Sequence, residues 1–306
     1  MRLVFAGTPA AAVPSLRRLA ASGHEIVTVV TRRDAPLGRK RVLTPSPVAQ
    51  AAEDLGLPVL RTDRLDDATT AALTALEPDL GVIVAYGGLV REPLLSAPAH
   101  GWINLHFSLL PRWRGAAPVQ HALIAGDVET GAAVFRLVPG LDEGDVYDEL
   151  RMPMPVTATA GELLDTLSAD GAELLERVVD AIAAGTAVAV PQVGEPTYAH
   201  KLTAEDGRIR WDEPAAAVLG RIRGTTPEPG AHTTLDGARV KVLSARATDG
   251  ADRLAPGAVR LVGKDVHVGT ADEPIVLERV QPAGKQAMDA AAWARGIRTA
   301  DPVVGS

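Results

Sequence analysis

The stretch GWINLHFSLLPRWRGAAP, residues 101–118, joins a strand-like alternation to a turn that contains proline. Successive side chains of a β-strand point to opposite faces of the sheet. The alternation separates an apolar face from a polar one, namely Ile103, Leu105 and Phe107 against Asn104, His106 and Ser108. Pro111 has no backbone N–H to pair, so it ends the strand. The polar face therefore lies near the end of a strand, where α/β sheets gather their functional groups.

Two interpretations of this polar face stay open from these residues alone. A single histidine in a strand is commonly a hydrogen-bonded structural residue, and an asparagine beside a turn is a common turn former. Three polar side chains on one face, next to a turn, are equally typical of a functional site.

Alternating strands and helices surround this stretch. Strands are predicted at 2–7, 25–31, 59–62, 80–88, from 102 onward and at 131–138, and helices at 12–23, 46–56, 67–76, 117–126 and 161–185. Ser46 before Pro47 is a typical helix start, because serine accepts free N–H groups of the first turn and proline suits the first helical position. The alternation predicts an α/β fold with a Rossmann-like, mostly parallel sheet that carries helices on both faces.

The second part of the chain has a different pattern of predicted secondary structure. A length of 306 residues suggests two domains, since one domain usually spans about 100–200 residues. Residues 186–200 mix proline and glycine and are typical of a connector, and from residue 201 short strands alternate with turns. We expect a catalytic domain at 1–185, a linker at 186–200 and a small β-barrel domain at 201–306.

Composition narrows the class of protein. The chain has no cysteine, which excludes disulfides and thiolate metal sites and fits a reducing compartment. Its apolar runs are shorter than the roughly 20 residues that span a bilayer, and the N-terminus has no signal-peptide pattern. The seven histidines are scattered, without a metal-binding spacing. We expect a soluble cytoplasmic protein with no metal and no membrane partner, and a monomer.

Charge is unevenly distributed along the chain. The net charge is −7, yet the segment RRDAPLGRKR, residues 32–41, is strongly basic and includes Arg39, Lys40 and Arg41. A basic cluster on an acidic protein is a candidate anion site, although a charge run is more often a solvated loop.

Other motifs favour proton transfer over covalent catalysis. FAGTP, residues 5–9, lacks the three glycines of a dinucleotide loop and the lysine of a phosphate-binding loop. VPGLDEGDVY, residues 138–147, places Asp142 between two glycines, but its spacing does not fit a calcium loop. Because this loop follows a predicted strand, we expect it at the end of the sheet where His106 lies. No serine or cysteine nucleophile motif occurs. Asn104, His106 and Asp142 suit acyl-type transfer, because an amide can bind a developing oxyanion and a histidine supported by an aspartate can move a proton.

The segment NLHFSLLPRWRGAAPVQHALIAGDVETGAAVFRLVPGLDEGDVY, residues 104–147, resembles the formyltransferases that use 10-formyltetrahydrofolate. Their pattern is Asn-x-His, a Ser-Leu-Leu-Pro turn and a later Gly-Leu-Asp-x-Gly loop. Further matches extend over nearly the full length: FAGTP, GRKRVLTPSPVAQAAEDLGLPV, VAYG, PRWRGAAPVQ and HKLTAEDGRIRW. Taken as a whole, the chain looks like the branch of this family that formylates methionyl initiator tRNA for translation initiation.

The resemblance implies a role for each matching residue. Asn104 is expected to hold the formyl oxygen, while His106 and Asp142 handle protons as the methionyl amine attacks. The tetrahydrofolate site is expected to include Ser108, Leu109, Leu110 and Pro111. The resemblance also implies that Arg39, Lys40 and Arg41 contact tRNA, that the C-terminal domain is an OB-like barrel that binds tRNA, and that no metal takes part. Phe107 departs from the family pattern, and by alternation it points away from the polar face.

Two alternatives remain in view. A glycinamide-ribonucleotide formyltransferase would resemble only the first domain, and an amino-sugar formyltransferase would leave the basic segment unexplained. A nucleic-acid-binding module without catalysis is a different class, and the intact Asn104, His106 and Asp142 count against it.

Overall fold

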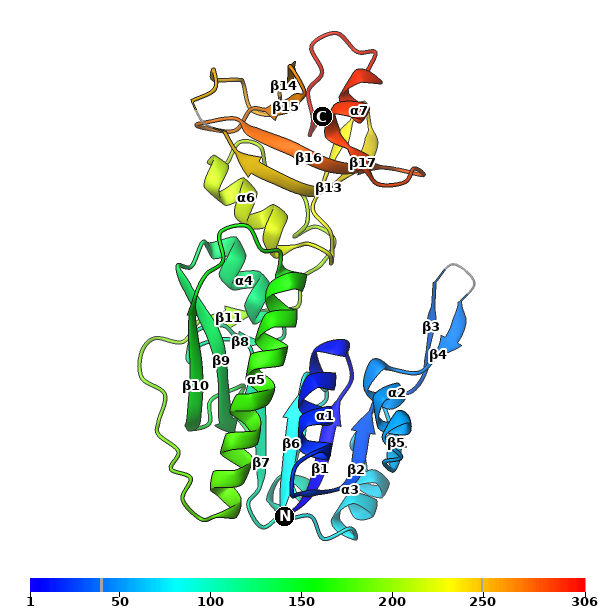
Figure 1. Cartoon of the computed structure of the whole chain (residues 1–306), viewed down its shortest axis with the longest axis vertical. Helices are drawn as coiled ribbons and strands as arrows, with labels where there is room; N and C mark the ends of the chain where they lie inside the picture. The colour runs from blue at the N-terminus through cyan, green and yellow to red at the C-terminus, as the bar shows by residue number, and fades with distance from the viewer. Residues whose placement is uncertain (39–40, 249, 306) are drawn as a thin grey trace. The chain divides into compact units, whose positions relative to one another are not determined.

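The computed structural model describes residues 1–38, 41–248 and 250–305 (Figure 1). The chain divides into two compact units. The first unit comprises Met1–Ala116, Thr130–Met152 and Leu164–Ala199, and the second comprises Ala117–Glu129, Pro153–Leu163 and His200–Ser306. The segment predicted as a linker is thus packed, up to Ala199, within the first unit. Within the described ranges, no helix is both long enough and apolar enough to cross a membrane.

A seven-stranded sheet forms the centre of the first unit, in the order β10-β9-β7-β6-β1-β2-β5. Its strands are β1 (Arg2–Gly7), β2 (Glu25–Thr31), β5 (Val59–Arg61), β6 (Leu80–Val84), β7 (Trp102–His106), β9 (Glu129–Arg136) and β10 (Val146–Pro153). The five strands from β7 to β5 pair in parallel. The predicted mostly parallel, Rossmann-like sheet is therefore confirmed.

Helices cover both faces of this sheet. The helical elements whose residues lie in this unit are η1 (Ala10–Ala12), α1 (Val13–Ala20), α2 (Pro47–Asp54), α3 (Asp67–Thr74), η2 (Leu94–Ser96) and most of α5 (Ala160–Ala183). On one face, Leu73 of α3 and Leu94 of η2 share a buried cluster with Val4 and Ile83 of the sheet. On the other face, α5 approaches so closely that a Cβ at Gly171 would lie 3.1 Å from the Leu105 side chain.

Local sequence signals explain several of these elements. The Ser46 side chain accepts a hydrogen bond from the Ala49 N–H, and α2 begins at Pro47, as predicted. Gly81 in β6 leaves room for the indole of Trp102, which would lie 2.1 Å from a Cβ at that position. Trp102 is almost fully buried, and its indole N–H donates to the Leu94 carbonyl. This contact fixes η2 against the start of β7.

The sequence did not predict the direction of β9, nor five further strands of this unit. β9 runs antiparallel to β7, and β10 continues the sheet beyond β9 as an edge strand. The basic segment contributes β3 (Ala35–Leu37) to a small antiparallel hairpin with β4 (Val42–Thr44). A further short parallel pair joins β8 (Arg114–Gly115) to β11 (Tyr198–Ala199).

The second unit has a core of its own, built mainly by antiparallel strands. Its sheet has the order β12-β13-β16-β15-β14, with β17 paired to β16. The bounds are β12 (His232–Leu235), β13 (Ala238–Ala247), β14 (Val259–Val262), β15 (Asp265–Val268), β16 (Ile275–Pro282) and β17 (Met288–Asp289). Helices α6 (Ala215–Gly224) and α7 (Ala290–Arg295) contribute Val218, Ile222 and Trp293 to the core. A third helix, α4 (Pro118–Ala125), contacts α6 within this unit. The predicted C-terminal domain of short strands is confirmed.

Candidate active site

Asn104 and His106 lie in β7, at the carboxyl end of the parallel strands. The His106 side chain is 6% exposed, and its Nε2 lies 2.8 Å from the backbone oxygen of Trp113. A carbonyl oxygen only accepts hydrogen bonds, so Nε2 carries the proton and Nδ1 presents a lone pair. The turn that follows the strand therefore selects the tautomer of His106.

Asp142 reaches His106 by a route that the sequence did not indicate. The sequence predicts that both segments end strands at the same edge of the sheet. This prediction is wrong for the strand before Asp142, because β9 runs antiparallel to β7. Arg136, at the end of β9, pairs with Ile103 near the start of β7. The connection from β9 to β10 nevertheless places the Asp142 Oδ2 atom 3.8 Å from His106 Nδ1. The structure thus brings the imidazole and the carboxylate together from strands of opposite direction.

The Asp142 loop is held in one conformation by close backbone contacts. Asp142 has a φ of 50°, in the left-handed region, and its Oδ2 accepts the Gly115 N–H at 2.8 Å. A Cβ at Gly144 would lie 1.6 Å from the Arg136 oxygen, so this position requires glycine. The two glycines noted in the sequence therefore belong to a tightly packed turn.

Two residues that the sequence did not point to brace the same loop. The Gln192 side-chain amide donates to the backbone oxygens of Asp142 and Gly144, both at 2.8 Å. Its oxygen accepts from Arg114, at 2.7 Å from Nη2 and 3.2 Å from Nε. Gln192 lies in the segment that composition marks as a linker, and only its place in the fold reveals these contacts.

The electrostatics of the pair favour a neutral imidazole. Burial lowers the pKa of His106 below its usual value, while the Asp142 charge and the hydrogen bond to Trp113 partly offset this effect. The distance of 3.8 Å is too long for a direct hydrogen bond, so Nδ1 is free to accept a proton from a third group. A protonated His106 would then face a carboxylate.

Asn104 supplies an unsatisfied polar group to the same face of β7. Within the part of the chain that the structure describes, its Oδ1 atom is buried and has no hydrogen-bond partner. Leaving such an atom unpaired costs free energy, so a buried amide of this kind is a candidate for contact with a substrate.

The lowered pKa of His106 predicts a pH dependence of stability. Above about pH 6.5 the imidazole is neutral in both the folded and the unfolded state. Below that pH the unfolded chain binds a proton that the folded chain resists, so the free energy of unfolding should fall by up to about 1.4 kcal/mol per pH unit until the folded pKa is reached. Urea unfolding of the wild type and of His106→Gln from pH 8 to pH 5 measures this term. Parallel curves for the two proteins would contradict it.

The Ser108–Pro111 segment is largely committed to packing. Ser108 donates its hydroxyl to the Arg112 oxygen at 2.6 Å, and Leu110 packs with Ala133 and Phe135. Leu109 lies over Gly131 of β9, where a Cβ would be 2.6 Å from its side chain. Pro111 is also buried, and Phe107 is 6% exposed. The segment is therefore held rigidly beside β7 by its packing.

The basic segment is a separate element of the first unit. Arg41 is exposed and has a φ of 49° at the turn between β3 and β4. Arg39 and Lys40 lie outside the described residues. Leu37, Val42 and Leu43 of the same hairpin are also strongly exposed, at 67%, 59% and 66%.

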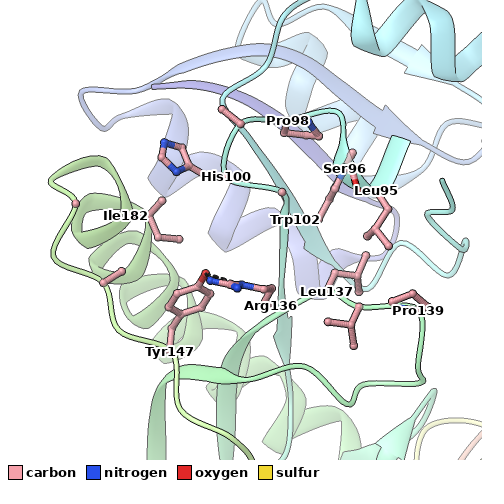
Figure 2. A pocket seen from close by; sticks show the side chains of 15 residues that line it. Leu95, Ser96, Pro98, His100, Trp102, Arg136, Leu137, Pro139, Tyr147 and Ile182 are labelled. Atoms are coloured by element: carbon pink, nitrogen blue, oxygen red, sulfur yellow. Dashed lines mark hydrogen bonds between the residues drawn. The ribbon is translucent and has the colours of Figure 1, made fainter. Parts of the chain in front are cut away.

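A cavity of about 610 Å³ lies at the other end of β7, near Trp102 (Figure 2). Figure 2 shows the Arg136 guanidinium pointing to the Tyr147 hydroxyl, to which Nη2 donates at 3.0 Å. Asn104, His106 and Asp142 do not line this cavity. The three candidate catalytic residues are thus distinct from it. Among the described residues, no group of three or more His, Cys, Asp or Glu side chains has the arrangement of a metal site.

Comparison with known families identifies the class of protein. The family model described as formyl transferase matches residues 1–179, and the one described as formyl transferase, C-terminal domain, matches residues 201–298. The chain belongs to the formyl transferase family.

Curated proteins of one name are similar to this chain over nearly its full length. The methionyl-tRNA formyltransferase of Clavibacter sepedonicus is 62% identical over 303 residues, which is 99% of each chain. That of Leifsonia xyli subsp. xyli is 61% identical over 296 residues, 97% of each chain.

Solved structures share the fold at low identity. The N-formyltransferase from Helicobacter canadensis, in complex with folinic acid and dTDP-3-aminofucose, has a TM-score of 0.69 at 16% identity and covers 92% of this chain and 98% of its own. Glycinamide ribonucleotide transformylase 1 from Symbiobacterium toebii has a TM-score of 0.52 at 21% identity, over 60% of this chain and 88% of its own.

Proposed function

We propose that this protein transfers the formyl group of 10-formyltetrahydrofolate to the free α-amino group of methionyl initiator tRNA, giving N-formylmethionyl-tRNA. The observation that carries the proposal is the convergence of His106 and Asp142, from two distant segments, in a chain 62% identical to enzymes of that name. Because the relatives match over nearly the whole length, the likeness includes both units.

In this proposal His106 acts as the base. Its Nδ1 lone pair accepts a proton from the attacking amine while Nε2 stays bonded to Trp113. The Asp142 carboxylate, 3.8 Å away, stabilises the imidazolium, which then returns the proton to the nitrogen that leaves the formyl carbon. The balance is one C–N bond formed and one broken, with no net loss of a proton and no covalent enzyme intermediate.

Asn104 is the candidate for binding the formyl oxygen. Its amide N–H group would donate to that oxygen as negative charge develops. Ser108, Leu109, Leu110 and Pro111 would line the tetrahydrofolate site. The packing of Leu110 against Ala133 and Phe135 supports this assignment, because it would hold the segment rigid beside a flat folate ring. The folate supplies an activated formyl group, and no metal has a part in this scheme.

Binding of the tRNA is assigned to residues outside the candidate catalytic site. Arg39, Lys40 and Arg41 would contact phosphates of the tRNA, and residues 201–306 would form a tRNA-binding domain, after a catalytic domain at 1–185 and a linker at 186–200. The match of a separate C-terminal family model to 201–298 supports this division. The substrate also implies a cytoplasmic location, where translation begins.

One assay separates this function from its alternatives. Purified protein is incubated with 10-formyltetrahydrofolate and, in parallel, with methionyl initiator tRNA, an amino sugar nucleotide or glycinamide ribonucleotide. Formylation of the tRNA alone supports the proposal. Formylation of a small amine in its place would assign another member of the family, and no transfer with intact folate binding would favour a binding protein.

The basic segment allows a selective prediction. We expect Arg39→Ala and Arg41→Ala to weaken the use of methionyl-tRNA while leaving folate affinity and thermal stability nearly unchanged. Each lost phosphate contact should reduce the log–log salt dependence of tRNA binding by about 0.7–0.9. The salt slope is measured against Arg177→Ala, which removes an exposed cation that pairs with Asp148. If tRNA kinetics and slope match this control, the segment is only a solvated charge run, and loss of folate binding would place it in the cofactor pocket.

A further inference from the structure

The side chain of Gln192 uses its full capacity for hydrogen bonds. A primary amide has two N–H donors and two acceptor lone pairs. The donors reach the backbone oxygens of Asp142 and Gly144, and the oxygen receives two N–H groups from Arg114. A residue in a segment of low regular structure is thus fixed at four points.

Two of these bonds reach the loop that carries the candidate carboxylate, and the other two link Gln192 to Arg114. Asp142 is held through its backbone oxygen by Gln192 and through its carboxylate by the Gly115 N–H, which follows Arg114 in the chain. Arg114 also lies 3.5 Å from Glu143, and its side chain is only 11% exposed. Gln192, Arg114 and Gly115 therefore hold the loop at Asp142, Glu143 and Gly144. Asp142 has a left-handed backbone conformation that needs such support.

Only an amide fits both ends of this brace. The loop presents two carbonyl oxygens, which need a donor, and Arg114 presents a cation, which needs an acceptor. A carboxylate would satisfy Arg114 and repel the carbonyls, and an apolar side chain would satisfy neither. The chemistry of the contacts selects glutamine.

We propose that Gln192, together with Arg114, is a positioning residue that holds the Asp142 carboxylate beside His106 during formyl transfer. The inference rests on the proposed function, in which these two groups handle the proton. Gln192 touches neither reactant in this scheme and acts through Asp142.

The main test uses Gln192→Met, which keeps the length of the side chain and removes all four hydrogen bonds. We expect kcat to fall by about 10²-fold, since a misplacement of about 1 Å can cost that much, with the KM for tRNA nearly unchanged. The Asp142 charge raises the pKa of His106, so a retreat of the carboxylate should lower that pKa further. NMR titration of the His106 imidazole, assigned with His106→Gln, measures this shift without any turnover.

Matched variants separate positioning from folding. Val193→Met places the same side chain one position away, where the native residue is 88% exposed, and should behave as the wild type. Asp142→Asn removes the charge itself, and adding Gln192→Met to it should change neither kcat nor the His106 titration further. Gln192→Glu keeps the acceptor for Arg114 and should still lose activity; it carries the same test if Gln192→Met does not fold.

Three results would overturn the proposal. The first is a Gln192→Met protein with unchanged kcat and His106 titration. The second is a lower Tm with normal kcat per folded molecule. The third is an effect fully additive with Asp142→Asn. Failure of the function itself is distinct, because a wild type that does not formylate methionyl-tRNA still allows the titration of His106 to be compared between variants.

Discussion

Replacing His106 with alanine is expected to lower kcat for formyl transfer by about 10²–10⁴-fold, the usual contribution of a positioned acid–base group. The reason is that the Nδ1 lone pair is the proton acceptor beside Asp142, and Nε2 is committed to the Trp113 oxygen. Binding of tRNA should change little, because the ring is buried in the first unit. Single-turnover kinetics with saturating folate and tRNA measure the chemical step.

The matched control for this prediction is His100→Ala. His100 belongs to the same unit, is exposed and borders the cavity at the opposite end of β7. Its loss should leave kcat unchanged. In addition, the midpoint of the acid limb in the wild-type pH–rate profile should lie below pH 6.5, because burial lowers the pKa of His106. A folded His106→Ala protein with near-normal turnover would remove His106 from the mechanism.

Asn104→Ala should have the second largest effect, a fall in kcat of about 10²–10³-fold, as seen when one donor to a developing oxyanion is removed. The affinity for folate should change much less, because the hydrogen bond to the formyl oxygen strengthens only as charge develops. Comparing kcat with the dissociation constant of a non-reactive folate separates the two effects. An equal loss in both would mean that Asn104 only binds the ground state.

The sequence offers an unusually clean probe of this residue. Asn104 is the only asparagine in the chain. Labelling with ¹⁵N-asparagine therefore gives one side-chain amide pair, whose chemical shift reports directly on contact with a formylated folate. The absence of any shift on binding would place the formyl oxygen elsewhere.

Elements with strong local signals could be predicted from the sequence. After Glu25 the run EIVTVVT consists only of β-branched residues, and β2 covers those same residues, Glu25–Thr31. The start of α2 followed from Ser46 and Pro47, whose preferences act within one helical turn. Such elements need no knowledge of distant neighbours.

Features set by distant contacts could not be predicted. β10 alternates weakly and carries Asp148, Glu149 and Arg151, so only its pairing with β9 makes it a strand. The direction of β9 is not encoded in its own residues. As a result, the sequence identifies Asp142 as a site candidate but predicts the wrong edge of the sheet for the end of the strand that precedes it. Gln192 gave no signal, because proline and glycine around it are typical of a linker.

The position of β9 and β10 at one edge of the sheet has a consequence for how activity is lost. Asp142 lies on the connection between these two strands, whereas His106 belongs to β7, the outermost of the five parallel strands. Peripheral strands commonly open in local unfolding events that cost less free energy than global unfolding. Fraying of this edge would separate the carboxylate from the imidazole and leave the parallel strands folded. We therefore expect reversible loss of activity at temperatures or denaturant concentrations below those that unfold the parallel strands.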